Sequence, residues 1–321
     1  MTNIRIIDGL MARRPGLLAL LGGALPATGF EPLHLWPVTL ACLALMIQLL
    51  WRAPDRKGAF KIGYAFGLGQ FAIGLNWIAH AFTFQDAMPH WLGYPAVVIL
   101  SFYLALYPGL AALIGWQLGR GRPQLFALFL ACAWLLTEYL RATMFTGFAW
   151  NPLGVIWLGT GVDQLGTVIG TYGLGLIAML GGGAVWWAAH GQWRPAGLVL
   201  AGLGIVAALG LVRAWHIGTN EVSGAAASIL VVQPNINQNE KYDPDLEELN
   251  FRRLSSLTRG PTNDARLIFW PEAAVPAILD MEPRWRARIA TQLGQHELLM
   301  LGGDKFHFEE QGNVINTNKL V

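Results

Sequence analysis

Long apolar runs dominate the first two-thirds of the chain, and short segments holding most of its charges separate them. A membrane core of roughly 30 Å is crossed by about 20 apolar helical residues, or fewer when flanking side chains reach the surface. The pattern therefore predicts seven membrane-spanning helices. Their expected positions are 16–30, 36–51, 60–82, 91–118, 125–139, 162–189 and 195–215.

From Ala225 the pattern changes to short β-type runs that alternate with helix-like stretches. The expected strands are 227–233, 267–270 and 297–303, and the expected helices are 246–257 and 284–293. Strands that alternate with helices indicate a layered α/β domain. We therefore predict a transmembrane helical domain over 1–220 and a second, α/β domain over 221–321.

Composition and charge support this division. The chain is 54% hydrophobic and 13% charged, whereas soluble domains carry about 25% charged residues. Residues 1–216 hold 12 Lys and Arg and 6 Asp and Glu, and the remainder holds 10 and 14.

The basic residues also predict an orientation, because they concentrate on the cytoplasmic side of membrane proteins. With a cytoplasmic N-terminus and seven spans, ten Lys and Arg fall inside and only Arg141 and Arg213 fall outside. We therefore expect an inner-membrane protein of a Gram-negative cell, with its C-terminal domain in the periplasm.

Cys42 and Cys132 both lie in apolar runs, so they form neither a disulfide framework nor a Cys-rich metal site. The histidines show no metal-ligand spacing. Gly63, Gly67, Gly69 and Gly74 have a spacing that suits close packing of membrane helices, and Gln70 is expected to hydrogen-bond between helices.

Two features of the predicted membrane domain involve polar or interfacial groups. Glu138 and Arg141 are three residues apart on one helical face, and we expect them to pair because a lone charge in a membrane is costly. The uncharged, aromatic segment TGFAWNPLG, 146–154, follows on the outer side. It is either an interfacial anchor or a loop that shapes a lipid-access site.

The sharpest local feature of the second domain is RLIFWPEAAVP, 266–276, in which an apolar strand ends at Pro271 and Glu272. A carboxylate at a strand end beside apolar walls can act as a general base. A solvated loop acid is the alternative interpretation of Glu272.

Together, several segments resemble the bacterial apolipoprotein N-acyltransferase family. The resemblance implies a membrane bundle with a nitrilase-like αββα domain and a Glu-Lys-Cys triad. Glu272 would be the general base, and Asn316 would line the site. Tyr242, which stands where many members have Trp, would line it too. The segments are GFEPLHLWP (29–37), GLGQFAIGLNWI (67–78), EYLRATMFTGFAWNPLG (138–154), VVQPNINQNEKYDPD (231–245) and FWPEAAVP (269–276).

The family reaction moves an acyl chain from a phospholipid to the N-terminal amine of a diacylglyceryl-cysteine on a lipoprotein, through a thioester acyl-enzyme. The implied partners are therefore a phospholipid acyl donor, a diacylated apolipoprotein acceptor and membrane lipid. No cofactor, metal or nucleic acid is expected, and we expect a monomer.

The family's lysine and cysteine have no counterpart in this sequence. Lys305 and Lys319 lie before or at the Asn316 strand rather than in the family's lysine segment, and Cys42 and Cys132 are expected inside the membrane. We therefore expect a C-terminally truncated chain that is inactive by itself. A non-catalytic membrane protein that binds or scaffolds lipoproteins is the alternative. A transporter is a third interpretation, but no pair of interrupted spans carries buried charges, as ion-coupled carriers usually do.

Overall fold

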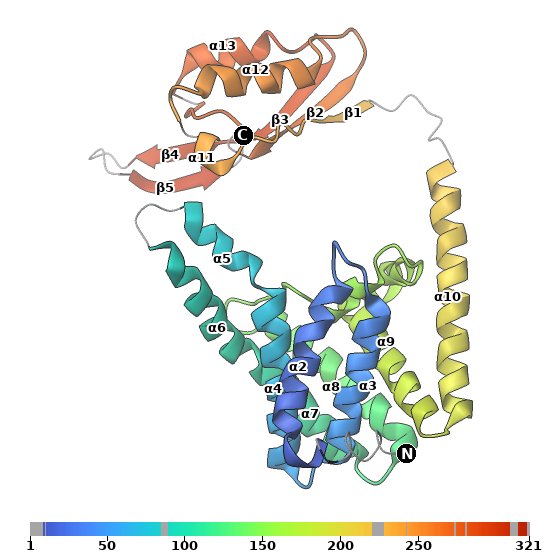
Figure 1. Ribbon diagram of the computed structural model, residues 1–321. Helices are drawn as coiled ribbons and strands as arrows, with labels where there is room; N and C mark the ends of the chain where they lie inside the picture. The colour runs from blue at the N-terminus through green and yellow to red at the C-terminus, as the bar shows by residue number, and fades with distance from the viewer. Residues whose placement is uncertain are drawn as a thin grey trace. The chain divides into compact units, whose positions relative to one another are not determined.

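The computed structural model describes residues 9, 11–84, 89–219, 228–241, 243–272, 274–279, 281–308 and 314–319. It divides into two compact units, Met1–Glu221 and Val222–Val321. Figure 1 shows that helices make up the described part of the N-terminal unit and that the C-terminal unit combines strands with helices.

The N-terminal unit packs its helices around one large apolar core. The core holds side chains such as Leu43, Met46, Phe66 and Phe126, all at most 1% exposed. The helices of this unit are α2 (Pro15–Ala24), α3 (Trp36–Trp51), α4 (Arg56–Gly74), α5 (Trp77–Ala81), α6 (Gly93–Leu104), α7 (Leu106–Gly119), α8 (Pro123–Thr143), α9 (Gly166–Ala189) and α10 (Trp193–Thr219), with 3-10 turns between several of them.

Local sequence signals explain where these helices begin and bend. A proline occupies the first turn of α2, α3 and α8, where its missing N–H costs no helical hydrogen bond. The Asp55 side chain accepts from the Gly58 N–H at 2.7 Å and caps α4. Gly170, with φ +69°, kinks α9 near its start.

Glycines allow the helices to approach one another closely, as expected. A Cβ at Gly63 would lie 2.5 Å from the Pro108 carbonyl of α7, and one at Gly69 would lie 2.1 Å from the Leu20 carbonyl of α2. Such contacts need a residue without a side chain. The prediction of glycine-mediated packing is confirmed at these positions.

In the described residues, four helices are long and apolar enough to cross a membrane: His90–Gly119, Leu125–Thr143, Val162–Ala189 and Trp193–Gly218. The apolar helices Pro15–Gly29 and Trp36–Trp51 are shorter. A helical membrane domain is thus supported, and the count of seven spans stays a prediction.

The expected helices 60–82 and 91–118 are each divided. α4 ends at Gly74 and α5 starts at Trp77, while only Ala105 separates α6 from α7, so that His90–Gly119 still counts as one long helix. At the first break, a Cβ at Gly74 would lie 2.3 Å from the Asn151 amide nitrogen, so the segment after α8 packs tightly there.

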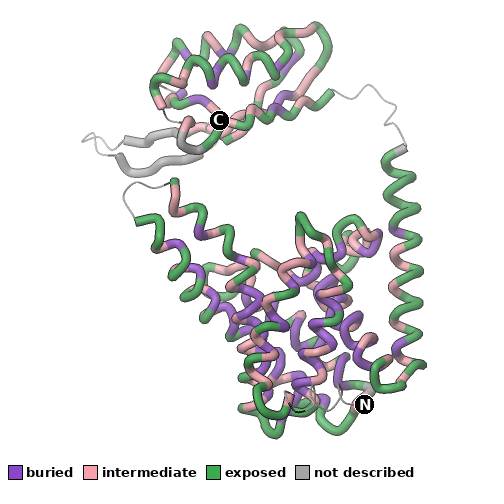
Figure 2. Tube along the Cα trace, viewed as in Figure 1, coloured by how far each residue is buried: buried purple, intermediate pink, exposed green. Residues whose placement is uncertain are grey.

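Helix α10 shows most clearly that the unit is built for an apolar environment. Figure 2 shows exposed residues along most of its length. Leu198, Ile205 and Leu209 are 78%, 60% and 65% exposed. Such a continuous apolar surface on one helix is suited to lipid.

The C-terminal unit is a parallel three-stranded sheet in the order β1-β2-β3, covered on one face by two helices (Figure 1). Three strands and two helices, β1, β2, β3, α12 and α13, agree with the predicted positions, whereas α11 was not predicted. Their bounds are β1 (Ser228–Val231), α11 (Gln238–Lys241), α12 (Glu247–Thr258), β2 (Arg266–Glu272), α13 (Pro283–Ala290) and β3 (Glu297–Gly302). An antiparallel pair, β4 (Asp304–Phe308) and β5 (Val314–Lys319), follows.

Aromatic side chains fill the space between this sheet and its helices. Phe251 of α12 packs on Trp285 of α13 at 5.3 Å and on Trp270 of β2 at 6.1 Å between ring centroids. The Trp270 indole N–H donates to the Thr258 hydroxyl at 2.9 Å. The end of β2 therefore packs on an apolar core.

Candidate active site

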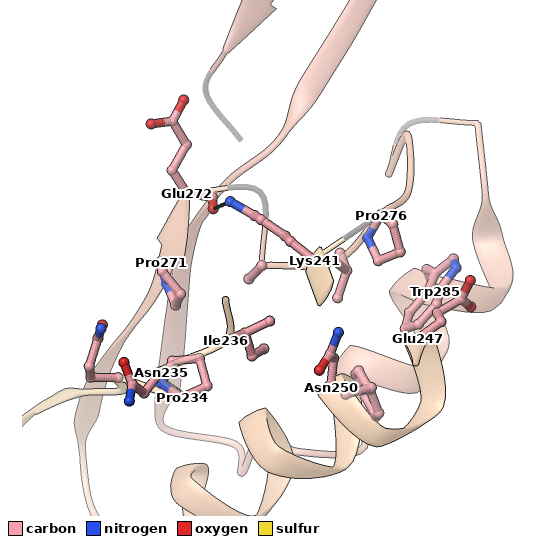
Figure 3. A pocket seen from close by; sticks show the side chains of 14 residues that line it. Pro234, Asn235, Ile236, Lys241, Glu247, Asn250, Pro271, Glu272, Pro276 and Trp285 are labelled. Atoms are coloured by element: carbon pink, nitrogen blue, oxygen red, sulfur yellow. Dashed lines mark hydrogen bonds between the residues drawn. The ribbon is translucent and has the colours of Figure 1, made fainter. Parts of the chain in front are cut away.

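A pocket of about 100 Å³ lies where β1 and β2 end. Because the two strands are parallel, their carboxyl ends meet at one edge of the sheet, the usual position of ligand sites in open α/β folds. Gln233–Ile236, which follow β1, form one wall, and Pro271 and Glu272 form another (Figure 3). Phe251, Val275 and Trp285 supply apolar surface.

Glu272 is the last residue of β2 and is exposed. The register between β2 and β3 shifts between Phe269 and Glu272, which then pairs with Gly302. A Cβ at Gly302 would lie 3.1 Å from Glu272 Cγ, so the glycine leaves space for the glutamate stem. Figure 3 shows the Glu272 side chain leaving the strand on the side away from Asn250 and Trp285.

The Lys241 side chain holds the backbone at this strand end. The Lys241 Nζ donates to the Glu272 carbonyl oxygen at 2.8 Å. In turn, the Asn250 amide donates to the Glu240 carbonyl at 2.9 Å and so anchors α11 to α12. This chain of contacts ties α12, α11 and β2 together around the pocket.

Neither Lys241 nor Asn250 was singled out from the sequence. Asn250 is 6% exposed and shares the buried face of α12 with Phe251, Leu254 and Thr258. A polar residue in the apolar stripe of an amphipathic helix was the available signal. Lys241 gave no signal, because its partner is 31 residues away.

In the described part of this unit, the carboxylates whose pKa is clearly shifted are bound by structural partners. Burial opposes the charge of Glu297, but hydrogen bonds from the Gly294 N–H, Arg266 and Thr262 outweigh it and lower the pKa of Glu297. Hydrogen bonds from Arg288 and Arg252 lower the pKa of Glu248. Glu297 lies at the start of β3 and Glu248 on α12, so neither lies at the end of β2.

The other predicted site residues are less fully described. Tyr242 lies outside the described residues. Asn316 belongs to β5, where its backbone pairs with His307, but its side chain lies outside the described residues. Cys42 and Cys132 belong to α3 and α8 of the N-terminal unit.

The predicted pair in the N-terminal unit is present and deeply buried. Arg141 Nη2 lies 3.6 Å from Glu138 Oε1, and the two side chains are 2% and 4% exposed. Both hold the segment after α8: Arg141 donates to the Phe148 and Trp150 carbonyls at 3.0 and 2.7 Å, and Glu138 accepts from the Leu153 N–H at 2.8 Å.

Residues 22–184 match the family model described as the apolipoprotein N-acyltransferase N-terminal domain. The chain belongs to the apolipoprotein N-acyltransferase family. The match confirms the family that the sequence resemblance had indicated.

Curated proteins named apolipoprotein N-acyltransferase are similar over most of the chain. The one from Methylococcus capsulatus is 31% identical over 92% of this chain and 58% of its own length. Those from Vibrio parahaemolyticus and Ralstonia nicotianae are 33% and 32% identical, each over 83% of this chain and about half of their own lengths. The chain thus spans little more than half the length of these relatives.

Proposed function

We propose that this chain supplies the membrane part and the first part of the catalytic domain of an N-acyltransferase that modifies lipoproteins. The acyl donor is a phospholipid, and the acceptor is the N-terminal amine of a diacylglyceryl-cysteine. Glu272 acts as the general base. The observation that carries this proposal is the position of Glu272 at the carboxyl end of β2, beside a pocket, in a member of this family.

The proposed chemistry proceeds in two transfers. A base removes the proton of a cysteine thiol, and the thiolate attacks the phospholipid ester, forming a thioester and releasing the lysophospholipid alkoxide, which takes up a proton. The acceptor amine then attacks the thioester, losing a proton as the thiolate leaves. Tyr242 and Asn316 would line the site of these steps.

We further propose that these 321 residues do not turn over by themselves. The chemistry needs a thiol beside the base, whereas Cys42 and Cys132 are carried by apolar helices of the N-terminal unit. A chain that retained lipopeptide binding without turnover would act as the non-catalytic binding protein that is the alternative function.

The exposed face of the parallel sheet supports a nitrilase-like αββα layering. Ile229 and Val231 of β1 and Leu298 of β3 are 68%, 71% and 70% exposed, on the face opposite the buried Ile268 and Trp270. Parallel sheets are covered on both faces in nearly all proteins. A second layer against this face is therefore part of the proposal.

For the membrane arrangement, we propose seven spans, a cytoplasmic N-terminus and a periplasmic C-terminal unit in the inner membrane. The ten-to-two distribution of Lys and Arg between the two sides supports this orientation.

A chimera tests the role of Glu272 despite the expected inactivity of the chain. The chain is joined to the part of the Methylococcus capsulatus relative that it does not match, and acyl transfer from phospholipid to a diacylated lipopeptide is measured. We expect turnover by the chimera, and a loss of about 10²- to 10⁴-fold in kcat on Glu272→Gln. Glu248→Gln, on the surface of α12, is the matched control. Full activity of the Glu272→Gln chimera would contradict the role of Glu272 as the base. Turnover by the 321 residues alone would contradict their proposed inactivity.

A further inference from the structure

Four buried side chains line one small cavity between α4, α7 and α8. They are Gln70, Trp134, Glu138 and Arg141, and each is at most 4% exposed. Each has a buried polar atom that makes no hydrogen bond of ordinary geometry among the described residues, namely Gln70 Oε1, Trp134 Nε1, Glu138 Oε2 and Arg141 Nη2, although the Trp134 and Arg141 side chains lie close to the Glu138 carboxylate. A buried polar atom left without a hydrogen bond costs about 1–3 kcal/mol, so four around one cavity require an explanation.

The chemistry of these atoms identifies the ligand class. Trp134 Nε1 and Arg141 Nη2 only donate, while Gln70 Oε1 and Glu138 Oε2 only accept. The arginine disfavours a metal cation, and the carboxylate disfavours an anion. A neutral molecule that accepts two hydrogen bonds and donates two satisfies all four atoms, and water is the smallest such molecule.

The size of the cavity limits the occupant further. It offers about 10 Å³ to the centre of a water-sized sphere, and one water needs about 10–15 Å³ by this measure. A lipid head group or a peptide side chain is much larger. The cavity is therefore matched to a single water molecule.

A pair of tyrosines joins the lining of the cavity to that of a larger pocket. Tyr107 lines the cavity, and its hydroxyl lies 2.8 Å from the Tyr103 hydroxyl. Tyr103 in turn lines an apolar pocket of about 230 Å³, together with Met144–Phe148 of the segment that follows α8.

We infer that this cavity binds one structural water molecule, which completes the hydrogen bonding of the Glu138–Arg141 pair and thereby holds the segment 144–153 in its folded form. Arg141 and Glu138 make the direct contacts with that segment. Trp134 and Gln70 act through the water as positioning residues. This inference does not depend on the acyl-transfer proposal.

Double-variant stability tests the shared water in the full chain, reconstituted in lipid nanodiscs. Gln70→Leu and Trp134→Phe each remove one of the four groups while keeping the side-chain bulk. If both act through one water, the drop in Tm of the double variant equals that of the larger single variant. Trp187→Phe is the matched control, because the Trp187 indole already donates to the Pro123 carbonyl at 3.0 Å. Its effect should add to that of Gln70→Leu.

Amide exchange tests the link to the segment. We expect the Phe148 and Leu153 amides to exchange roughly fivefold faster in Trp134→Phe and Gln70→Leu, as for the loss of one hydrogen bond, and at an unchanged rate in Trp187→Phe.

In the unaltered chain, proton-detected NMR should show magnetisation transfer from water to the Trp134 indole N–H, a signal assigned by its loss in Trp134→Phe. No transfer to this indole, or Tm losses that simply add, would overturn the bound water. An unchanged exchange rate at 144–153 in both variants would overturn the positioning role.

Discussion

At the residue scale, the carboxylates Glu297 and Glu272 of the C-terminal unit differ in where they lie, one at the start of β3 and the other at the end of β2. Glu297 is enclosed by donors, with Arg266 Nε at 2.6 Å, the Gly294 N–H at 2.7 Å and the Thr262 hydroxyl at 3.0 Å. Such donors stabilise the ionised form, which suits a permanent structural charge. Glu272 ends β2 and is among the residues that line the pocket, and this position is the basis of its proposed role as a general base.

Replacing Glu297 tests the structural assignment. Because its pKa in the folded chain is below the ordinary value of 4.5, Glu297 stabilises the fold fully above that pH. Its contribution is lost as the pH falls through the lower, folded-state pKa. Glu297→Gln should lower the free energy of opening β2 and β3 by about 1.5–3 kcal/mol at pH 7, measured by amide exchange in the full chain.

The pH dependence supplies a second readout for the same variant. Carboxyl groups ordinarily titrate between about pH 5 and pH 3. Over this range, amide protection should fall less in Glu297→Gln than in the unaltered chain. Asp264→Asn, at an exposed bend, is the control and should keep the full pH dependence. Identical pH profiles for Glu297→Gln and the unaltered chain would reject the structural role.

At the scale of elements, apolar periodicity and β-type runs located β1, β2, β3, α12 and α13 of the C-terminal unit, because the pattern that marks the buried face of each element lies within its own residues. The paired Glu138 and Arg141 were predictable for the same reason, since three residues separate them on one helix. The cavity beside them was not, because Gln70 comes from another helix. Near the division of the expected span 60–82, Gly74 packs against Asn151, which also lies far along the chain.

Close helix packing predicts that alanine has different effects on stability at two glycines. Gly63→Ala would place a Cβ 2.4 Å from the Ala112 Cβ and 2.5 Å from the Pro108 carbonyl, so α4 and α7 must separate at a cost of about 1–3 kcal/mol. Gly202→Ala in α10 meets nothing within 4 Å. It should be neutral or stabilising by up to about 1 kcal/mol.

Thermal unfolding in detergent measures both glycine variants under the same conditions. Equal Tm values for Gly63→Ala and Gly202→Ala would show that α4 and α7 are not in close contact. The comparison is informative because both substitutions add the same methyl group to a helix.

At the scale of the whole molecule, two kinds of surface require two different environments. The exposed leucines and isoleucines of α10 suit lipid, whereas α12 and α13 expose charged side chains such as Arg252 and Arg284. Family membership is established, while the arrangement across the membrane and the chemistry at Glu272 are proposals that depend on this division.

The side of the membrane on which the C-terminal unit lies is the most direct test of the account. Single cysteines are introduced as Asn263→Cys, exposed before β2, and Lys57→Cys, exposed in the first turn of α4, in a chain carrying Cys42→Ala and Cys132→Ala. Intact cells of a Gram-negative host are treated with a maleimide that crosses the outer membrane but not the inner one. The account predicts labelling at 263 in intact cells and at 57 only after the inner membrane is opened. Labelling at 57 but not at 263 in intact cells would contradict it.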